Sequence, residues 1–339
     1  MSANGISNLT YKADRQVAKL DLAQAKRQGK VVARDGTITG SVDTSKPYYR
    51  SNNVYDLTSL PNPYDAGTNT SNADDTPNTG GLLIARPWVG VVSLAAPTTL
   101  AEALPSETFV QLESWYDGSD SSSFTPNNPA DGATFTQWSD KSAFAHNANP
   151  IGGATTRASY QTNELNTLSV VRFDGNDGLS INPYSSLANA PALAIFIVMK
   201  MTSATGNPAV FVTNSGATGI TYDSAAGKFL IKAASGIGTS TVANDSTAFH
   251  IHSFAYDGTQ TGNANRLKYR YDKTDVTLNF AATTVGSTLS ASNTTLYIGN
   301  NNGTNFFTGD VAEFLVFTHV LTSTEISNVE NYLSTKWGL

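Results

Sequence analysis

Cysteine is absent from this 339-residue chain, which excludes a disulfide framework and thiolate chemistry. Charged residues are also few, at 14% against 40% hydrophobic residues. Thr, Ser, Asn and Gly fill much of the remainder, a mixture typical of β-rich proteins with many polar turns. The longest apolar stretch, residues 190–199, contains a proline and is too short to span a membrane. Residues 1–12 lack a basic segment followed by an apolar one, so we expect no secretory signal and a soluble chain made in a cytoplasm.

Motifs of nucleotide-binding and hydrolytic enzymes are missing as well. The sequence contains no Gly-x-Ser-x-Gly elbow, P-loop or dinucleotide-binding fingerprint. His250 and His252 lie two apart in a predicted strand, so they share one face and have the spacing of metal ligands. No adjacent cluster of His, Asp or Glu supplies further ligands, so we interpret both as ordinary strand residues.

Charge is distributed unevenly along the chain. Residues 1–50 carry nine Lys or Arg and four Asp, a net charge of +5, and residues 51–339 carry 12 basic and 23 acidic side chains, a net charge of −11. A basic segment on an acidic body favours docking on a negatively charged partner. Nucleic acid and an acidic protein surface both fit, and so does a solvated helix face without a partner.

Residues 1–95 predict an N-terminal docking arm without a core of its own. We expect a weakly amphipathic helix at about 12–28, a hairpin at about 31–42, and an extended segment at 47–88. Four tyrosines in the extended segment favour docking, because aromatic side chains anchor interfaces and are rare in disordered linkers. Residues 96–108 predict a linker. The expected particle-docking residues are Lys12, Arg15, Lys19, Lys26, Arg27, Tyr48, Tyr49, Arg50, Tyr55 and Trp88.

Residues 109–339 predict one β domain that ends in a short helix. Apolar runs recur between clusters of Gly, Asn, Asp and Ser, the pattern of an antiparallel sandwich or jelly roll. Near the end, Thr322 and Glu325 have the spacing of a helix capping box, and Gly338 marks the helix stop after Trp337. The predicted strands are 169–173, 194–201, 209–213, 228–232, 250–256, 266–271, 295–298 and 312–317, the last of them buried on nearly both faces.

Four short motifs occur in order along this domain: Trp115-Tyr-Asp117, Trp138-Ser-Asp140-Lys-Ser142, Arg172-Phe-Asp-Gly175 and Tyr297-Ile-Gly299. Together with the final strand and helix, they resemble a laminin-G-like, concanavalin A-like jelly roll over about 109–339. The resemblance implies a mainly β, antiparallel β-sandwich. It does not fix a ligand, because this superfamily binds sugars, proteins and lipids.

The N-terminal arm carries a second set of motifs: AKR (25–27), VARDGTITGSV (32–42), YYR (48–50), NVYDL (53–57) and RPW (86–88). They resemble the anchoring arms of virion structural proteins of tailed bacteriophages, especially the cyanophage type. The resemblance implies a virion protein, assembled in the host bacterial cytoplasm, whose partners are the major capsid protein or tail and neck proteins. We expect a homo-oligomer on the particle, with no nucleic acid partner and no membrane insertion.

Within a virion, an extended arm rich in tyrosine favours capsid decoration or a head fibre, because it suits lying across neighbouring capsid subunits. The displayed lectin-like domain would then adsorb weakly to host-surface polysaccharide. A tail or neck fibre, or a receptor-binding protein, is the first alternative. A non-viral carbohydrate-binding adhesin module is the second.

Glycosidase activity is not expected. Glucanases of the concanavalin A-like fold place paired carboxylates on one strand face as Glu-x-Asp-x-Glu or Glu-x-Asp-x-x-Glu. None of the seven glutamates of this chain has an Asp two residues further on. We therefore predict no catalytic residues and no cofactor, so that binding is the remaining role of the domain.

Two loops carry the candidate binding residues. In the Asn-rich loop 299–307, we expect amide and aromatic side chains to contact a sugar: Asn300, Asn301, Asn302, Asn305 and Phe306. Residues 116–124 are the other candidate loop, whereas Trp115 and Trp138 are expected in the core. Asp174 and Asp177, in the sequence FDGNDG, are the best candidates for a rim Ca²⁺, although loops of this composition are more often plain turns.

Overall fold

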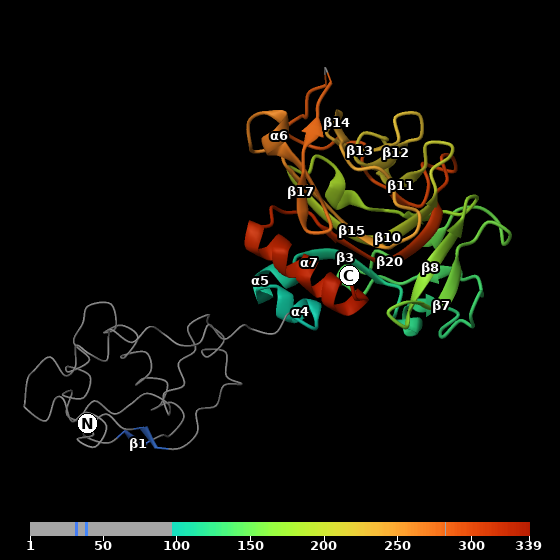
Figure 1. Ribbon diagram of the computed structural model, residues 1–339, viewed down its shortest axis with the longest axis horizontal. Helices are drawn as coiled ribbons and strands as arrows, with labels where there is room; N and C mark the ends of the chain where they lie inside the picture. Colours follow the sequence, from blue (N-terminus) through green and yellow to red (C-terminus); the bar gives the residue numbers. More distant parts are fainter. Residues whose placement is uncertain (1–30, 33–37, 40–96, 282) are drawn as a thin grey trace, which may run out of the picture. The chain divides into compact units, whose positions relative to one another are not determined.

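The computed structural model describes residues 31–32, 38–39, 97–281 and 283–339 of the chain (Figure 1). By its internal contacts the chain divides into two units, Met1–Ala95 and Ala96–Leu339. In the first unit, β1 (Val31–Val32) pairs antiparallel with β2 (Ile38–Thr39), inside the range where the sequence predicts a hairpin. The predicted helix at 12–28, the extended segment at 47–88 and all ten predicted docking residues lie outside the described residues.

The second unit contains two 8-stranded antiparallel sheets. The first, called the covered sheet below, has the order β17-β16-β15-β10-β20-β8-β7 with β3 paired to β20, and comprises β3 (Leu112–Asp117), β7 (Ser159–Leu165), β8 (Leu168–Asp174), β10 (Ala192–Ser203), β15 (His250–Asp257), β16 (Leu267–Tyr271), β17 (Thr274–Val276) and β20 (Thr308–Phe317). The second, called the pocket sheet, has the order β18-β14-β13-β12-β11-β19-β9-β6, and comprises β6 (Asn149–Pro150), β9 (Leu179–Ile181), β11 (Ala209–Thr213), β12 (Gly219–Asp223), β13 (Lys228–Ala233), β14 (Gly236–Ser240), β18 (Leu278–Asn279) and β19 (Leu296–Ile298). The predicted mainly β, antiparallel sandwich is confirmed.

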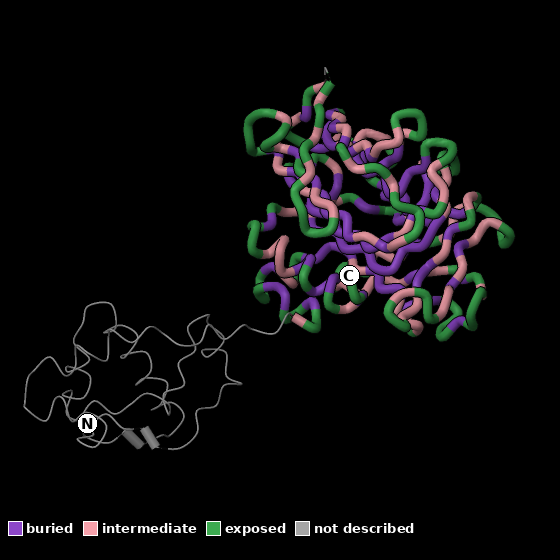
Figure 2. Tube along the Cα trace, viewed as in Figure 1, coloured by how far each residue is buried: buried purple, intermediate pink, exposed green. Residues whose placement is uncertain are grey.

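The main core lies between the two sheets. Ile195 and Phe314 of the covered sheet belong to one apolar cluster with Phe211 and Ile231 of the pocket sheet. Figure 2 shows the buried segments running through the interior of the domain and the exposed ones at its periphery. Burial of each such side chain stabilises the fold by roughly 1.5–3 kcal/mol, which makes this cluster the main source of stability.

The covered sheet is buried on its other face as well, because helices pack against it. In β10, Ile195 and Ile197 face the pocket sheet, while Phe196 and Val198 face a second apolar cluster. That cluster is completed by α4 (Leu100–Ala103) and α7 (Ser323–Trp337), with α5 (Ser106–Phe109) beside them. In Figure 1, α7 lies on the side of the covered sheet that is turned away from β11–β14. Within the described part of the chain, no helix is long and apolar enough to cross a membrane.

Helix α7 begins and ends where the sequence predicts. Thr322 is the N-cap, its side chain accepts the N–H of Glu325 at 3.2 Å, and Glu325 accepts the N–H of Thr322 at 2.8 Å. Gly338 closes the helix in the left-handed region, at φ 72°. Both are low-strain solutions for the unpaired backbone groups of helix ends.

Residues 96–108 do not form the predicted linker. They contain α4 and α5, and Leu100 is only 1% exposed in the apolar cluster that also holds Val329 and Leu333 of α7. Thr99 and Glu102 make a second capping box, which holds α4 in place. Composition suggested a linker because a four-residue helix is too short to show a periodic pattern. This segment is part of the folded domain.

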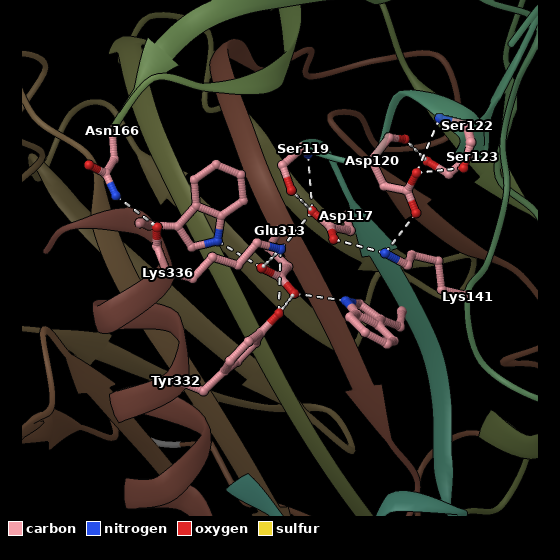
Figure 3. A network of polar contacts seen from close by, with 12 residues as sticks. Asp117, Ser119, Asp120, Ser122, Ser123, Lys141, Asn166, Glu313, Tyr332 and Lys336 are labelled. Carbon is pink, nitrogen blue, oxygen red and sulfur yellow. Dashed lines mark hydrogen bonds and ion pairs between the residues drawn. The ribbon is translucent and has the colours of Figure 1, made fainter. Parts of the chain in front are cut away.

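A buried carboxylate joins the covered sheet to α7 (Figure 3). Glu313 of β20 is fully buried and accepts four hydrogen bonds. Its Oε1 accepts from Trp115 Nε1 at 2.7 Å and from the Tyr332 hydroxyl at 2.8 Å. Its Oε2 accepts from Trp337 Nε1 at 2.7 Å and from Lys336 Nζ at 2.8 Å. Every oxygen lone pair of this carboxylate therefore has a donor.

The Trp-x-Asp and Trp-Ser-Asp-Lys-Ser motifs surround this carboxylate. Asp117 pairs with Lys336 at 2.7 Å and with Lys141 at 3.0 Å. Burial by itself would raise the pKa of Asp117, but the two lysines hold it below its ordinary value. Asp140 accepts the backbone N–H of Trp115 at 2.7 Å. The motifs that suggested the fold thus hold it together.

Candidate functional site

The outer face of the pocket sheet is the second place where polar side chains gather. Strand β13 sends alternate side chains to opposite faces. Phe229 and Ile231 belong to the core, so Leu230 and Lys232 lie on the outer face. Thr221 of β12 pairs with Leu230 and therefore lies on the outer face too. Unlike the covered sheet, this face has none of the described helices packed over its centre.

A cavity of about 260 Å³ opens on this face, where β11, β12 and β13 meet two loops. Its volume lies just below the range of about 300–1,000 Å³ that is usual for small-molecule sites, so it suits a small ligand unit. Its lining combines strand residues with loop asparagines: Asn207, Ala209, Thr221, Asp223, Leu230, Lys232, Asn301 and Asn305. We call this cavity the strand pocket.

Lys232 is the cationic group of the strand pocket. Burial lowers the pKa of Lys232, and no neighbouring carboxylate offsets that effect. By contrast, the neighbouring outward lysine, Lys228, donates its Nζ to the carbonyl of Thr241 at 2.7 Å. A partly desolvated ammonium without a counter-ion gains stability when an anion reaches it.

Other polar groups of the strand pocket also keep bonding capacity. The Thr221 hydroxyl is buried and has no hydrogen-bond partner among the described residues. Asp223 uses Oδ1 to accept the N–H of Ala225 at 2.9 Å and of Ala226 at 3.0 Å, which fixes the β12–β13 turn. The Asn301 side chain takes part in none of the hydrogen bonds found among the described residues, although its backbone pairs with Thr304. These groups can bond to the hydroxyls of a polar ligand.

The predicted binding residues of the Asn-rich loop fall into two groups, those that line the strand pocket and those that do not. Asn301 and Asn305 line the strand pocket. Asn302 is exposed and accepts the Tyr297 hydroxyl at 3.0 Å, and Phe306 is half-buried and absent from the pocket lining. That Asn301 and Asn305 contact a ligand stays a prediction.

For Asn300, the prediction of ligand contact is wrong. Its side chain is 0% exposed, donates to the carbonyl of Ile298 at 3.2 Å, and accepts the N–H of Gly303 at 2.9 Å. Asn300 therefore shapes the loop from inside and leaves contact with solvent to its neighbours. In the other candidate loop, Tyr116 and Phe124 are fully buried in the core, as Trp138 is.

The predicted metal pair, Asp174 and Asp177, lies together at the end of β8. Asp177 Oδ2 accepts the N–H of Asp174 at 2.8 Å, and Asp177 Oδ1 is buried without a hydrogen-bond partner among the described residues. Burial raises the pKa of Asp177 to about 6, and the nearby Asp174 adds to that effect. Two carboxylates are a start toward the six to eight oxygen ligands that Ca²⁺ takes. In residues 97–281 and 283–339, however, no group of three or more His, Asp or Glu has metal-binding spacing.

The two strand histidines are used structurally. His252 is 2% exposed, its Nδ1 lies 2.7 Å from the Tyr269 hydroxyl, and burial lowers its pKa to about 3. His250 lies between Asp272, at 2.7 Å, and Asp245, at 3.6 Å. Both contacts agree with their interpretation as ordinary strand residues.

Sequence reasoning missed Thr221, Asp223 and Lys232. The only available signal was the alternation in β13, where KFLIKA places Lys228, Leu230 and Lys232 on one face. That pattern shows that the three side chains share a face, but it does not show which residues of other strands and loops lie next to them. Those neighbours depend on the whole fold, through the pairing of β11, β12 and β13 and the approach of the loops at Asn207 and Asn305.

Comparison with known proteins agrees with the architecture. Residues 173–327, which include the whole strand pocket, match the family described as the concanavalin A-like lectin/glucanases superfamily. No match was found among curated protein sequences. Sialidase from Trypanosoma rangeli in complex with sialic acid is similar in structure, with 14% identity, a TM-score of 0.47, and coverage of 72% of this chain and 36% of the sialidase.

Two further solved structures are similar at the same low level. Domain 4 of AbnA, an extracellular GH43 arabinanase from Geobacillus stearothermophilus, in complex with arabinotriose, has 11% identity, a TM-score of 0.44, and coverage of 65% of this chain and 98% of that domain. A mutant GH54 α-L-arabinofuranosidase, soaked with 4-nitrophenyl α-L-arabinofuranoside, has 14% identity, a TM-score of 0.40, and coverage of 60% and 51%. The chain thus spans about a third of the sialidase and about half of the arabinofuranosidase. The sandwich architecture is consistent with a concanavalin A-like fold, and residues 173–327 are similar to the concanavalin A-like lectin/glucanases superfamily.

Proposed function

We propose that this protein is a virion structural protein of a tailed bacteriophage that displays a carbohydrate-binding domain. Residues 1–95 would anchor the chain to the particle, and the β-sandwich would hold host-surface glycan in the strand pocket. The observation that carries the binding role is the set of underused polar groups, Thr221, Lys232 and Asn301, around one cavity on the outer face of the pocket sheet. Amide, hydroxyl and charged groups in a concave site are what a sugar requires for specific binding.

Binding without hydrolysis is the second part of the proposal. Glycoside hydrolysis generally needs two carboxyl groups placed on either side of the scissile bond. Among the residues lining the strand pocket, Asp223 is the single carboxylate, and one of its oxygens already serves the turn. Lys336 lies between Asp117 and Glu313, and Lys141 lies between Asp117 and Asp120. Asp117 and Glu313 are both buried, so each of these pairs has a member inside the domain, which argues against an acid and a nucleophile at one reachable site.

The virion role rests on the N-terminal sequence. The net charge of +5 over residues 1–50, the tyrosines of 47–88 and the resemblance to phage anchoring arms support it. We further propose capsid decoration or a head fibre, as a homo-oligomer bound to the major capsid protein. A tail or neck location and a non-viral adhesin are the alternatives, and the incorporation test below separates the adhesin from the virion locations.

A carbohydrate array with the full-length protein tests the binding role. We expect weak binding to bacterial surface polysaccharides, lost in Asn301→Ala and retained in Asn127→Ala, an exposed asparagine on the loop after β4 (Phe124–Thr125). Absence of glycan binding, or equal loss in both variants, would contradict the role of the strand pocket.

Particle incorporation tests the virion role. Deletion of residues 1–95 should leave a folded sandwich, because Ala96–Leu339 has its own core, and should abolish incorporation into phage particles. Incorporation of the truncated chain at the level of the full chain would exclude an N-terminal anchor. A chain that binds glycan but never joins particles would favour the adhesin.

A further inference from the structure

The other half-buried lysines of the sandwich have a polar partner. Lys141, Lys200 and Lys336 each have a carboxylate within 3.0 Å, and Lys228 donates to the carbonyl of Thr241. Lys232 has no carboxylate partner among the described residues, and desolvation is the single influence on its pKa. An unpaired, partly buried ammonium costs stability, so its presence in a cavity calls for a ligand that compensates it.

The strand register shows that the neighbours of Lys232 across the sheet are uncharged. Lys232 pairs with Gly219 on one side and with Ile237 on the other. Thr221 and Leu230, which pair with each other across β12 and β13, are the next residues on the same face of the sheet.

Asp223 does not neutralise Lys232, because the two stand at opposite ends of the strand pocket. Asp223 pairs with Lys228, which precedes Lys232 by four residues on β13. At a rise of about 3.3 Å per residue, the two positions are about 13 Å apart along the strand. Asp223 accordingly does not offset the effect of burial, which alone lowers the pKa of Lys232. The pocket therefore has a positive end and a negative end.

We infer that the strand pocket selects a carboxylated sugar, with the sugar carboxylate bound by Lys232. This inference rests on the proposed carbohydrate-binding role and adds the ligand class. The carboxylate lies beside Lys232 in the strand pocket, the Thr221 hydroxyl donates to it or to the ring oxygen, and the sugar hydroxyls bond to Asn301, Asn305 and Asp223. Asp223 at the far end repels a second anionic group, so the ligand binds in one orientation.

The test uses the full-length protein and titration calorimetry with uronate oligosaccharides, each compared with its methyl ester. The methyl ester removes the charge and keeps the sugar. We expect the acid to bind about 10- to 100-fold more tightly than the ester, which is the range for one hydrogen-bonded charged contact. Tightening at low salt is expected for the acid alone.

Three variants of the lysines assign the effect. Lys232→Met should reduce affinity for the acid about 10- to 100-fold and leave the ester unchanged, and Lys232→Arg should restore most of it. Lys228→Met is the matched control, because it removes a lysine from the same strand face whose Nζ is already bonded to Thr241. Unfolding curves of all three variants confirm that each remains folded.

The outcomes distinguish failure of the proposed ligand class from failure of the proposed carbohydrate-binding function. Equal binding of acid and ester, or an unchanged affinity in Lys232→Met, overturns the carboxylate and leaves carbohydrate binding intact. Preference for a sulfated oligosaccharide over every uronate also overturns it, in favour of another anion. If neutral, carboxylated and sulfated sugars all fail to bind, the proposed carbohydrate-binding role itself is wrong.

Discussion

Replacement of Glu313 by Gln should destabilise the domain strongly. The side chain keeps its shape, but one oxygen becomes an NH₂ group. Four donors converge on the two carboxylate oxygens: Trp115 Nε1, the Tyr332 hydroxyl, Trp337 Nε1 and Lys336 Nζ. The NH₂ group of Gln can take the place of either carboxylate oxygen. In both orientations, the two donors that bonded to the replaced oxygen face the NH₂ group, which is itself a donor.

The size of the effect follows from those two unmatched donors. A buried donor left without a partner costs about 1–3 kcal/mol, and loss of one partner of a buried ion pair costs about 3–5 kcal/mol. Lys336 keeps its contact with Asp117 at 2.7 Å, which limits the loss. We therefore expect a loss of about 3–5 kcal/mol, a large part of the 5–15 kcal/mol that is usual for a domain. The last turn of α7, which carries Lys336 and Trp337, should unfold first.

Equilibrium unfolding in urea, followed by tryptophan fluorescence, measures this loss. Trp115 and Trp337 both contact Glu313, so the emission reports on the same region. Glu164→Gln is the matched control, because Glu164 forms a surface ion pair with Arg172 at 3.0 Å, and such pairs contribute about 0–1 kcal/mol. A Glu313→Gln variant within about 1 kcal/mol of the parent protein would refute the assignment of this carboxylate as the link between sheet and helix.

Buried groups give three more predictions. His252 has a folded pKa of about 3, so below pH 6.5 the unfolded chain takes up a proton at this residue and the folded chain does not. The domain should therefore lose up to about 1.4 kcal/mol of stability for each pH unit below 6.5. In His252→Gln the unfolding midpoint should change less between pH 7 and pH 5, and the same pH dependence in variant and parent protein would contradict this. Asp177 has the opposite sign, since its pKa is raised to about 6 and its contribution to stability is lost as pH rises through that value. Asp177→Asn should therefore stabilise the domain at pH 7.5 by about 1–2 kcal/mol in the absence of Ca²⁺. If millimolar Ca²⁺ raises the melting temperature of the parent protein and not that of the variant, the result would support the metal prediction. Leu100→Ala should lower the free energy of unfolding, measured in urea, by about 2–4 kcal/mol, because it leaves a cavity under α4. If residues 97–108 were a linker, the substitution would leave the free energy of unfolding unchanged.

The C-terminal end of the domain was predictable because local signals sufficed there. The capping box of Thr322 and Glu325 and the apolar run of β20 each lie within a dozen residues, and the structure places both as predicted. Strands such as β12 and β14 gave no comparable signal. Each is five residues long and begins with glycine, which weakens the strand pattern, and their place in the sheet comes from pairing with β13.

The strand pocket shows the limit of sequence reasoning more clearly. Asn301 and Asn305 were found because an Asn-rich loop is visible in a single stretch of sequence. Lys232 was not, because its relevance depends on having no carboxylate nearby in space. Lys228 and Lys232 look equivalent in sequence, and only the hydrogen bond from Lys228 to Thr241 separates them.

Glu313 and Lys232 are two charged groups that differ in how many polar partners the domain gives them. Both are charged and both are partly or fully removed from water, which costs free energy in each case. Burial raises the pKa of Glu313, and the four donors inside the domain offset that effect in part. Lys232 and the Thr221 hydroxyl recover none of the cost of burial from the described residues. Natural sequences usually depart from full polar satisfaction at functional sites. A binding partner outside the chain is therefore the simplest physical reason for these two groups to be where they are.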